Sequence, residues 1–290
     1  MESVDLSKKM PFLPKLKRKL FVPVVALLCL VAVGRLQSLR LNKLIDRANI
    51  VSPAEINQEV EAEKLRLKLL QTTPSFGFDN IIAVWTWLNF NQYFGDDLAR
   101  QQTGYSLSPE YFKIIVERDP RFLESYVGLS TSISLFAGKP KESVALMEKG
   151  LSLMCMDSGL TLEECEFPTP KIPRRAYYIW RYKAIDELLF LENIKTAQES
   201  FARAAQWAGT YSDPESQQVA ALSRATAEFL AGNPNRERIR ATQASAWASV
   251  LVNSLNTNDR RTRDQVIRQI EARGGKVTIS PEGGVSVQLP

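Results

Sequence analysis

The residue types that carry most enzyme chemistry are scarce in this chain. Its 290 residues include no histidine and three cysteines. Without histidine, Ser-His-Asp and Cys-His catalysis, imidazole metal sites and histidine pH switches are all excluded. The sequence contains no nucleophile elbow, phosphate-binding glycine loop or metal-ligand spacing. Its two glycine pairs, Gly274-Gly275 and Gly283-Gly284, fall at an expected helix end and an expected turn, where backbone conformation alone explains them. We therefore expect no catalytic, cofactor-binding or metal-binding residues.

Carboxylate chemistry of the glycosidase kind needs only Asp and Glu, so composition leaves it open. The adjacent acidic pairs are Asp96-Asp97 and Glu163-Glu164, and their neighbours give them no role beyond loop charge. A carboxylate-based extracytoplasmic enzyme stays as the minor alternative to the non-enzymatic function developed below.

Two cysteines are available to the folded part of the chain, Cys155 and Cys165, and Cys29 lies in an apolar segment. In an oxidising compartment Cys155 and Cys165 could form a disulfide across their spacing of ten residues. Two thiols without histidine make a poor zinc site. A disulfide and two unpaired cysteines both remain open.

The positive charge is concentrated at the N-terminus. The net charge is +5, and residues 1–50 hold ten Lys and Arg against three acids, which leaves residues 51–290 at −2. A nucleic-acid-binding domain carries its basic excess on the folded part. We therefore expect no nucleic-acid partner.

An uncharged run from Leu20 to Gly34 lies between Lys19 and Arg35. A helix of this length covers about 22 Å, against about 30 Å of bilayer core, and the flanking basic side chains can snorkel to the interface. We predict a basic cytoplasmic N-terminus over 1–19 and a single transmembrane anchor over 20–39. The positive-inside rule then places the bulk of the chain on the periplasmic or thylakoid-lumenal side.

A cleaved signal peptide is the rival interpretation, because a basic start, an apolar run and Ala32-x-Gly34 fit its pattern. Against it, no polar stretch precedes the cleavage position, and Arg35 would follow the cut. A buried core helix is a third interpretation, which the neighbouring basic cluster disfavours.

A helix start follows at Ser52-Pro53-Ala54-Glu55, with Ser as N-cap, Pro at the first position and Glu closing a capping box. The helix has an apolar stripe on an otherwise charged surface, formed by Ile56, Val60, Leu67 and Leu70. We predict a solvated amphipathic connector over 40–75 that holds the next domain away from the membrane.

Three later segments share one pattern of a small residue, a large apolar residue one turn on, and two packing residues. They are Ser108, Phe112, Ile115 and Val116; Ser143, Met147, Gly150 and Leu151; and Ala197, Phe201, Ala204 and Ala205. The first two are 35 residues apart and the next two 54, a 35-residue period with a 19-residue insertion at 155–173. Helix stops recur as Ala137-Gly138-Lys139-Pro140 and Ala231-Gly232-Asn233-Pro234.

This period resembles the tetratricopeptide (TPR) repeat, whose second helix has the small-x3-aromatic pattern. The nearest match to its first-helix signature is Trp85-x2-Leu88-Asn89-x2-Gln92, with Asn and Gln where the family prefers Gly and Tyr. Residues 122–136 and 179–191 serve as later first helices. The resemblance implies an all-α solenoid over 76–258, although no repeat has every signature position. A non-repeating all-α bundle is the alternative.

Aromatic residues are densest between Phe76 and Asp96. Helical spacing gives this block two faces, one with Ile81, Trp85, Leu88 and Gln92, the other with Trp87, Phe90, Asn91 and Phe94. A helix that is apolar almost all round is normally buried, so we predict that Trp85 and most of these aromatics are core residues. The block also resembles that of membrane-anchored TPR-like proteins of cyanobacteria, which implies the thylakoid membrane and photosystem assembly.

The pattern changes after Thr262. Val266, Ile267 and Ile270 predict a short helix, and apolar residues then alternate on both sides of the turn at Pro281-Glu282-Gly283-Gly284, which indicates a hairpin. A lone hairpin is marginally stable and needs the helix as a floor. We predict a helix plus β-hairpin tail over 259–290, either a docking edge for a partner strand or a terminal cap.

Stacked helix pairs form a concave groove that binds a peptide or a partner helix. The groove positions expected from the first helices are Asn89, Gln92, Tyr126, Arg181 and Tyr182. We predict a membrane-anchored scaffold that binds protein partners, subunits of a membrane complex, and helps to assemble or stabilise that complex. A permanent structural subunit is the alternative.

Overall fold

The structure, a computed structural model, describes residues 25–38, 53–156, 159, 165, 172–232 and 234–290. The chain divides into two compact units, Met1–Glu55 and Ile56–Pro290. In the first unit, residues 25–38 form a helix with every side chain exposed. None of the described helices is long and apolar enough to cross a membrane. Residues 20–24 and 39 of the predicted anchor, and all of 1–19, lie outside the described residues.

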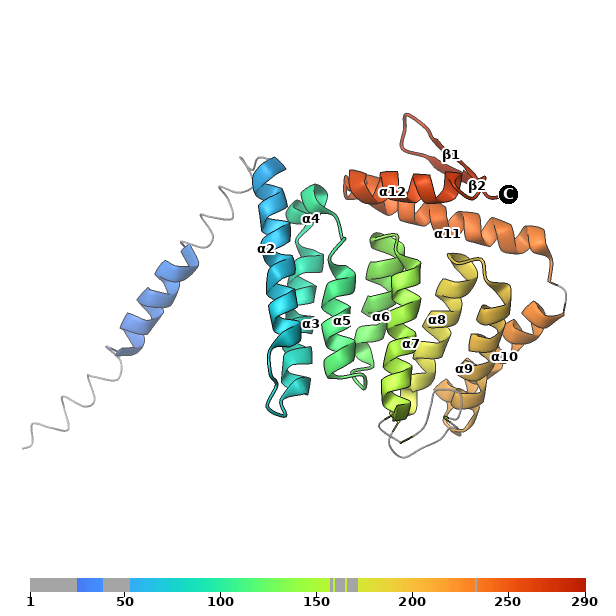
Figure 1. The fold of residues 1–290 in the computed structure, drawn as a ribbon, viewed down its shortest axis with the longest axis horizontal. Coiled ribbons are helices and arrows are strands. Elements are labelled where there is room, and N and C mark those ends of the chain that lie inside the picture. Colours follow the sequence, from blue (N-terminus) through green and yellow to red (C-terminus); the bar gives the residue numbers. More distant parts are fainter. Residues whose placement is uncertain (1–24, 39–52, 157–158, 160–164, 166–171, 233) are drawn as a thin grey trace, which may run out of the picture. The chain divides into compact units, whose positions relative to one another are not determined.

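The described part of the second unit is mostly helical, with a hairpin near the C-terminal end, and its first helix, α2, begins in the last residues of the first unit (Figure 1). The α-helices are α2 (Pro53–Thr72), α3 (Asp79–Gly95), α4 (Asp97–Thr103), α5 (Ser108–Arg118), α6 (Glu124–Ser130), α7 (Pro140–Met156), α8 (Tyr177–Leu189), α9 (Ile194–Gly209), α10 (Pro214–Ala231), α11 (Arg236–Asn256) and α12 (Arg260–Glu271). A π-helix, η1 (Thr131–Phe136), continues α6, and a 3-10 turn, η2 (Arg174–Ala176), precedes α8. The strands are β1 (Lys276–Ile279) and β2 (Val285–Gln288).

Helices α5, α7 and α9 contain the three segments that share the small-to-large pattern. All twelve pattern positions on them are buried. Packing follows chain order, with α3 on α5, α5 on α7, α7 on α8, α8 on α9 and α9 on α10. The 35-residue pattern therefore marks the helix faces that turn toward the core.

Tyr126 belongs to this core, so its predicted place in an open groove is wrong. Its side chain is fully buried, and its hydroxyl donates a hydrogen bond to the carbonyl of Pro120 at 2.9 Å. The ring fills the space beside Gly150, where a Cβ atom would lie 2.0 Å from the Tyr126 Oη atom. Gly150 is therefore the partner that lets α7 approach α6.

We expect Gly150→Ala to lower the free energy of unfolding by about 1–3 kcal/mol, because it overpacks a filled site. The matched control is Gly209→Ala near the end of α9, where the nearest atoms would lie 3.8 Å from the new Cβ. That change should be neutral or stabilising by up to about 1 kcal/mol, since Ala favours helix over Gly. Chemical denaturation of both variants measures the difference, and equal stability would contradict the packing assigned to Tyr126.

Helix α2 packs on the domain and is not a solvated connector. Leu67 is buried, and Val60 and Leu70 pack partly buried against the same core cluster. Gln71 also donates a 2.8 Å hydrogen bond to Glu117 of α5. Val60, Leu67 and Leu70 of the predicted stripe thus pack on the domain core, which the local pattern could not reveal. Residues 40–52 of the predicted connector and the Ile56 side chain lie outside the described residues.

A carboxylate lies in the core where η1, α7 and α8 meet. Asp186 is 1% exposed and accepts hydrogen bonds from Ser130 at 3.0 Å, Ser134 at 2.6 Å and Ser143 at 2.7 Å. Burial raises the pKa of Asp186 to about 6. The hydrogen bonds from the three serine hydroxyls lower this pKa and the charge of nearby Glu187 raises it, each by less than burial does. Ser130 ends α6 and Ser134 lies in η1, so Asp186 fixes the segment in which the helix changes to π geometry.

A second buried polar group lies one turn away on the same helix. Lys183 and Glu187 form an ion pair at 2.7 Å, and Ser200 of α9 bonds to both side chains. Each of these three residues is less than a tenth exposed. The buried charged side chains of α8 thus have partners on both sides, Asp186 toward η1 and α7, and Lys183 and Glu187 toward α9.

The predicted helix and hairpin of the tail are confirmed. Strands β1 and β2 are antiparallel, with Val277 opposite Val287 and Ile279 opposite Val285. The hairpin packs on α11 as well as on α12. The surface that supports it is therefore larger than the single helix that the sequence predicted. Val266 and Ile270 of α12 are fully buried in a cluster with Phe190 and Trp247, which ties the tail to the helical domain.

Cys155 and Cys165 form a disulfide, with Cα atoms 5.8 Å apart. Both cysteines are buried in the main core cluster, Cys155 near the end of α7. Of the two alternatives that the sequence left open, a disulfide or two unpaired cysteines, the structure has the disulfide. Most of the predicted insertion at 155–173 lies outside the described residues.

Candidate interaction surface

Helix α3 buries only one of its two apolar faces. Phe90 and Tyr93 are core residues, and the half-buried Trp87 packs its ring against Phe112 and Phe122. Trp85, by contrast, is 59% exposed. The expectation that Trp85 is a core residue is therefore wrong.

Trp85 is exposed because α3 lies near one end of the row of packed helices that runs from α2 to α10 (Figure 1). Helix α5 covers the face that carries Phe90. Helix α2 lies along one flank, where Arg66 donates a 3.4 Å hydrogen bond to Asn89. Within the described residues no further helix covers the side that carries Trp85.

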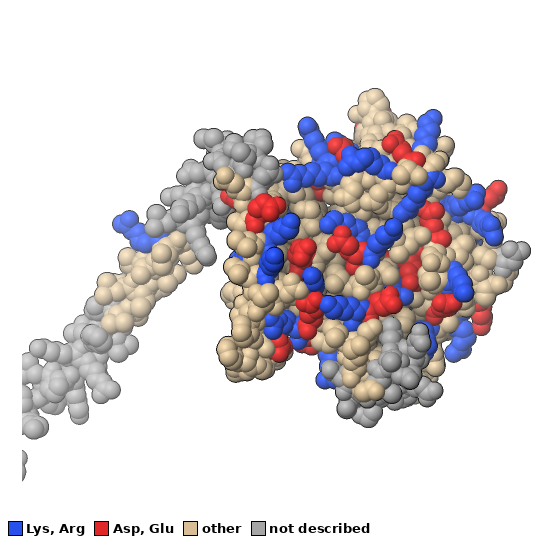
Figure 2. Space-filling model, in the orientation of Figure 1, with Lys and Arg blue, Asp and Glu red and all other residues tan. Residues whose placement is uncertain are grey.

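We define the apolar surface as the exposed residues of α3 and of the connection that precedes it. They are Phe76, Phe78, Ile81, Val84, Trp85 and Leu88, each 44% to 87% exposed. Figure 2 shows uncharged atoms gathered at the lower left of the domain, where the α2–α3 connection lies. Capping repeats of soluble solenoids have a polar outer face, and exposed apolar patches mark interaction sites. The composition of this end therefore favours a binding role.

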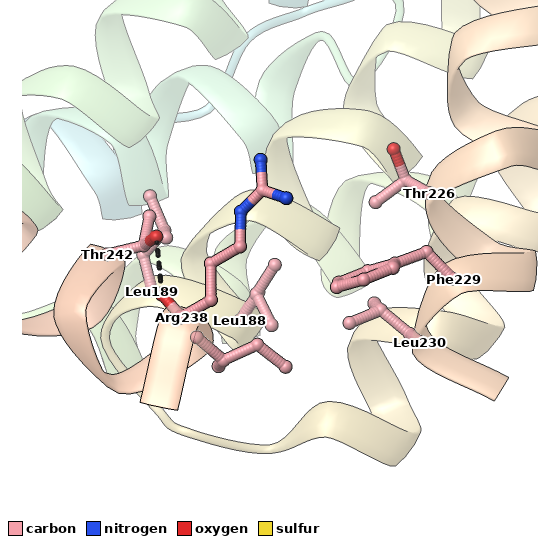
Figure 3. Close-up of a pocket in the computed structure, with 8 residues that line it drawn as sticks. Leu188, Leu189, Thr226, Phe229, Leu230, Arg238 and Thr242 are labelled. Atoms are coloured by element: carbon pink, nitrogen blue, oxygen red, sulfur yellow. Dashed lines mark hydrogen bonds between the residues drawn. The ribbon is translucent and has the colours of Figure 1, made fainter. Parts of the chain in front are cut away.

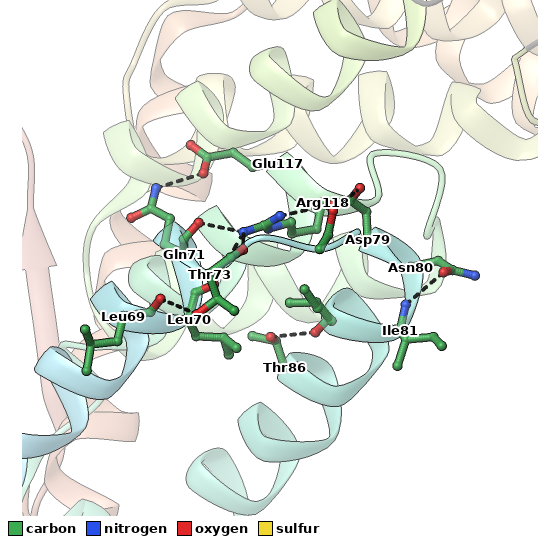
Figure 4. Close-up of polar contacts among 12 residues, drawn as sticks. Leu69, Leu70, Gln71, Thr73, Asp79, Asn80, Ile81, Thr86, Glu117 and Arg118 are labelled. Carbon is green, nitrogen blue, oxygen red and sulfur yellow. Dashed lines mark hydrogen bonds and ion pairs between the residues drawn. The ribbon is translucent and has the colours of Figure 1, made fainter. Parts of the chain in front are cut away.

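Arg118 of α5 holds the connection between α2 and α3 in place (Figure 4). Its guanidinium donates to the carbonyls of Gln71 at 2.7 Å and Thr73 at 2.6 Å, and it pairs with Asp79 at 2.8 Å. The Arg118 and Ser75 side chains hold the pKa of Asp79 below its usual value. One half-buried cation thus joins the end of α2 to the start of α3.

The connection also contains an unusual backbone conformation. Phe76 has a φ of +50°, and Gly77 follows with a φ of +90°. A bulky residue seldom adopts a positive φ, and such residues cluster at functional sites. Here the turn leaves the Phe76 ring 87% exposed beside the start of α3.

Two of the predicted groove residues lie on α3. Asn89 is half-buried, and its amide donates to the Trp85 carbonyl at 2.7 Å while its oxygen accepts from Arg66. Gln92 is exposed and lies one turn beyond Leu88, in line with Trp85. Gln92 therefore borders the apolar surface, whereas Asn89 is occupied by contacts with α2 and its own helix.

The other two belong to α8, far along the chain. Arg181 donates a 3.0 Å hydrogen bond to Ser223 of α10, and Tyr182 stacks on Tyr178 with ring centroids 5.9 Å apart. No hydrogen bond or ring contact between described residues joins this pair to Asn89 or Gln92. The structure therefore does not bring the five predicted residues into one site.

Of the two adjacent acidic pairs, only Asp96-Asp97 lies within the described residues. Asp96 caps α4, where its carboxylate accepts from the Ala99 amide at 3.1 Å. Asp97 lies exposed in the first turn of that helix, and Glu163 and Glu164 lie outside the described residues. Among described residues no group of three or more acids and cysteines is placed to hold a metal ion.

The apolar surface had a visible signal in the sequence, since Ile81, Trp85 and Leu88 share one side of the helix. What the sequence lacked was the identity of the covered face. Arg118 gave no signal at all, because its partners, Asp79 and two backbone carbonyls, lie 39 to 47 residues earlier in the chain. No protein-family model, curated protein or solved structure matches the chain.

Proposed function

We propose that the protein is a membrane-anchored helical-repeat scaffold that binds an apolar helix of a membrane-complex subunit on the apolar surface of α3. The observation that carries the proposal is the outward stripe of Ile81, Trp85 and Leu88, exposed by 51% to 59% on a helix whose other face is core. Apolar helix faces bind partner helices through anchors at this i, i+4, i+7 spacing.

The fixed position of α3 supports binding without a large ordering cost. Its inner face is locked by Phe90, and its start is held by Arg118 through Asp79. A surface on a rigid element loses little conformational entropy when a partner binds. Trp85 supplies the kind of large aromatic side chain that dominates interface energies.

Anchoring is supported by the sequence. The run from Leu20 to Gly34 with basic residues before it favours a retained signal-anchor. The resemblance to cyanobacterial TPR-like proteins makes a photosynthetic complex of the thylakoid the first partner to test.

The test is affinity capture of full-length protein from native membranes, comparing wild type with Trp85→Ser/Leu88→Ser. A buried interface tryptophan contributes at least about 2 kcal/mol, so we expect partner recovery to fall by about 30-fold. The matched control is Leu222→Ser, which changes a side chain of similar exposure on α10. Both variants should unfold at nearly the wild-type temperature.

Undiminished recovery by the Trp85/Leu88 variant would contradict the proposal. Loss of recovery with Leu222→Ser alone would move the interface to α10. The stoichiometry of the captured complex separates two forms of the scaffold. Association with assembly intermediates at low abundance indicates an assembly factor, and a fixed one-to-one ratio in the mature complex indicates a permanent subunit.

A further inference from the structure

A cavity of about 210 Å³ lies at the opposite end of the helical row, between the end of α8, the end of α10 and the start of α11. Helix α11 leaves α10 after the turn at Gly232 and packs on η1, α8, α12 and β2. Because α11 packs on these elements and does not run alongside α10, a gap stays open where the two helices diverge. This cavity is independent of the apolar surface on α3.

The walls of the cavity are apolar. They are formed by Leu188 and Leu189 of α8, Phe229 and Leu230 of α10, and Ile239 of α11. Leu230 and Ile239 are buried at its base, whereas Phe229 is 45% exposed and forms part of the rim. An apolar cavity of about 150 Å³ is known to hold benzene, so this one has room for roughly six to eight carbon atoms.

The polar side chains at the mouth of the cavity differ in how much hydrogen-bonding capacity they have left for a ligand. The hydroxyls of Thr226 and Thr242 already donate to the carbonyls of Leu222 and Arg238, each at 2.9 Å. They therefore have only acceptor capacity left. The guanidinium of Arg238, unlike its backbone groups, forms no hydrogen bond or ion pair within the described part of the chain. Figure 3 shows this guanidinium extended over the apolar side chains.

We infer that this cavity binds a small amphiphilic carboxylate, with the apolar body against Phe229 and Leu230 and the carboxylate on Arg238. A guanidinium presents a planar pair of N–H donors that matches a carboxylate. The same cation repels an amine head group. An alcohol of equal length keeps the apolar contact but loses the charge-assisted hydrogen bonds.

Octanoate is the probe, titrated calorimetrically into full-length protein in lipid nanodiscs, with empty nanodiscs as the blank for partitioning. We expect saturable binding that weakens at least tenfold in Arg238→Gln and severalfold in Phe229→Ala. The matched controls are Arg240→Gln and Leu222→Ala, exposed residues of α11 and α10 that do not line the cavity. All four changes are at exposed positions, so folding should be unaffected.

Octylamine should not bind, and octanol should bind no better to wild type than octanoate binds to Arg238→Gln. The inference fails if wild type shows no saturable binding above the nanodisc blank. It also fails if Arg238→Gln and Arg240→Gln weaken octanoate equally, because the charge would then act at long range. Neither failure touches the proposed scaffold, whose test uses Trp85 and Leu88.

Discussion

Replacing Phe90 by alanine is expected to lower the free energy of unfolding by about 3–5 kcal/mol, the usual cost of emptying a large aromatic site. Phe90 is 2% exposed and lies at the centre of the aromatic core, with ring centroids 4.5 Å from Phe112, 5.5 Å from Trp87 and 5.8 Å from Tyr111. Each neighbour would lose contact area that the remaining helices cannot restore. Urea denaturation followed by circular dichroism measures the loss.

The matched control is Trp85→Ala on the outer side of the same helix. Because Trp85 is mostly exposed, this larger truncation should change the free energy of unfolding by less than about 1 kcal/mol. A cost for Trp85→Ala equal to that of Phe90→Ala would mean that the Trp85 face is covered, and the proposed binding surface would be lost with it.

The second large effect is a pH dependence of stability that Asp186→Asn removes. The native pKa of Asp186 is about 6, raised by burial above the ordinary value of 3.8. A raised native pKa means that the stabilising contribution is fully present below the unfolded pKa and is lost as pH rises through the native one. The window therefore runs from about pH 4 to about pH 6.

The shift of about two pKa units corresponds to about 3 kcal/mol. Relative to Asp186→Asn, wild type should lose about that much unfolding free energy between pH 3 and pH 7. The measurement is denaturation of both proteins across this range, so that other titrating groups cancel in the difference. Glu187, the closest acid, is present in both proteins and is paired with Lys183.

Asp213→Asn provides a control with the opposite sign. Hydrogen bonds from Ser216 lower the pKa of Asp213 to about 2, so its contribution is present above the unfolded pKa and is lost as pH falls. Asp213→Asn should therefore change the pH dependence of the unfolding free energy only at the acid end of the range. A flat difference between wild type and Asp186→Asn would show that Asp186 is ionised in the native state at all these pH values.

The sequence alone determined the features that depend on residue type and on neighbours along the chain. The absence of histidine is a matter of composition. The helices α5, α7 and α9 follow from a period of 3.6 residues, and the hairpin follows from alternation around the turn at Gly283 and Gly284. The stop at Gly138 is equally local, since its φ of +63° suits glycine and Pro140 begins the next helix.

Only the tertiary structure decided which apolar and polar side chains are covered. Trp85 and Phe90 share one helix that is apolar on both sides, and local spacing gives both the same expectation of burial. Phe90 is covered because α5 arrives at that side, from a later part of the chain. Tyr126 likewise becomes a core residue because Gly150 leaves a space for its ring.

The same holds for the sites. Arg118 joins α2 to α3 through backbone carbonyls at the end of α2 and the Asp79 carboxylate at the start of α3. Asp186 gathers serines 43 to 56 residues earlier, and Arg238 stands over a gap where α11 diverges from α10. A period along one helix fixes the direction of each side chain. It does not fix which helix lies in that direction, because packing depends on contacts between segments that are distant in the sequence.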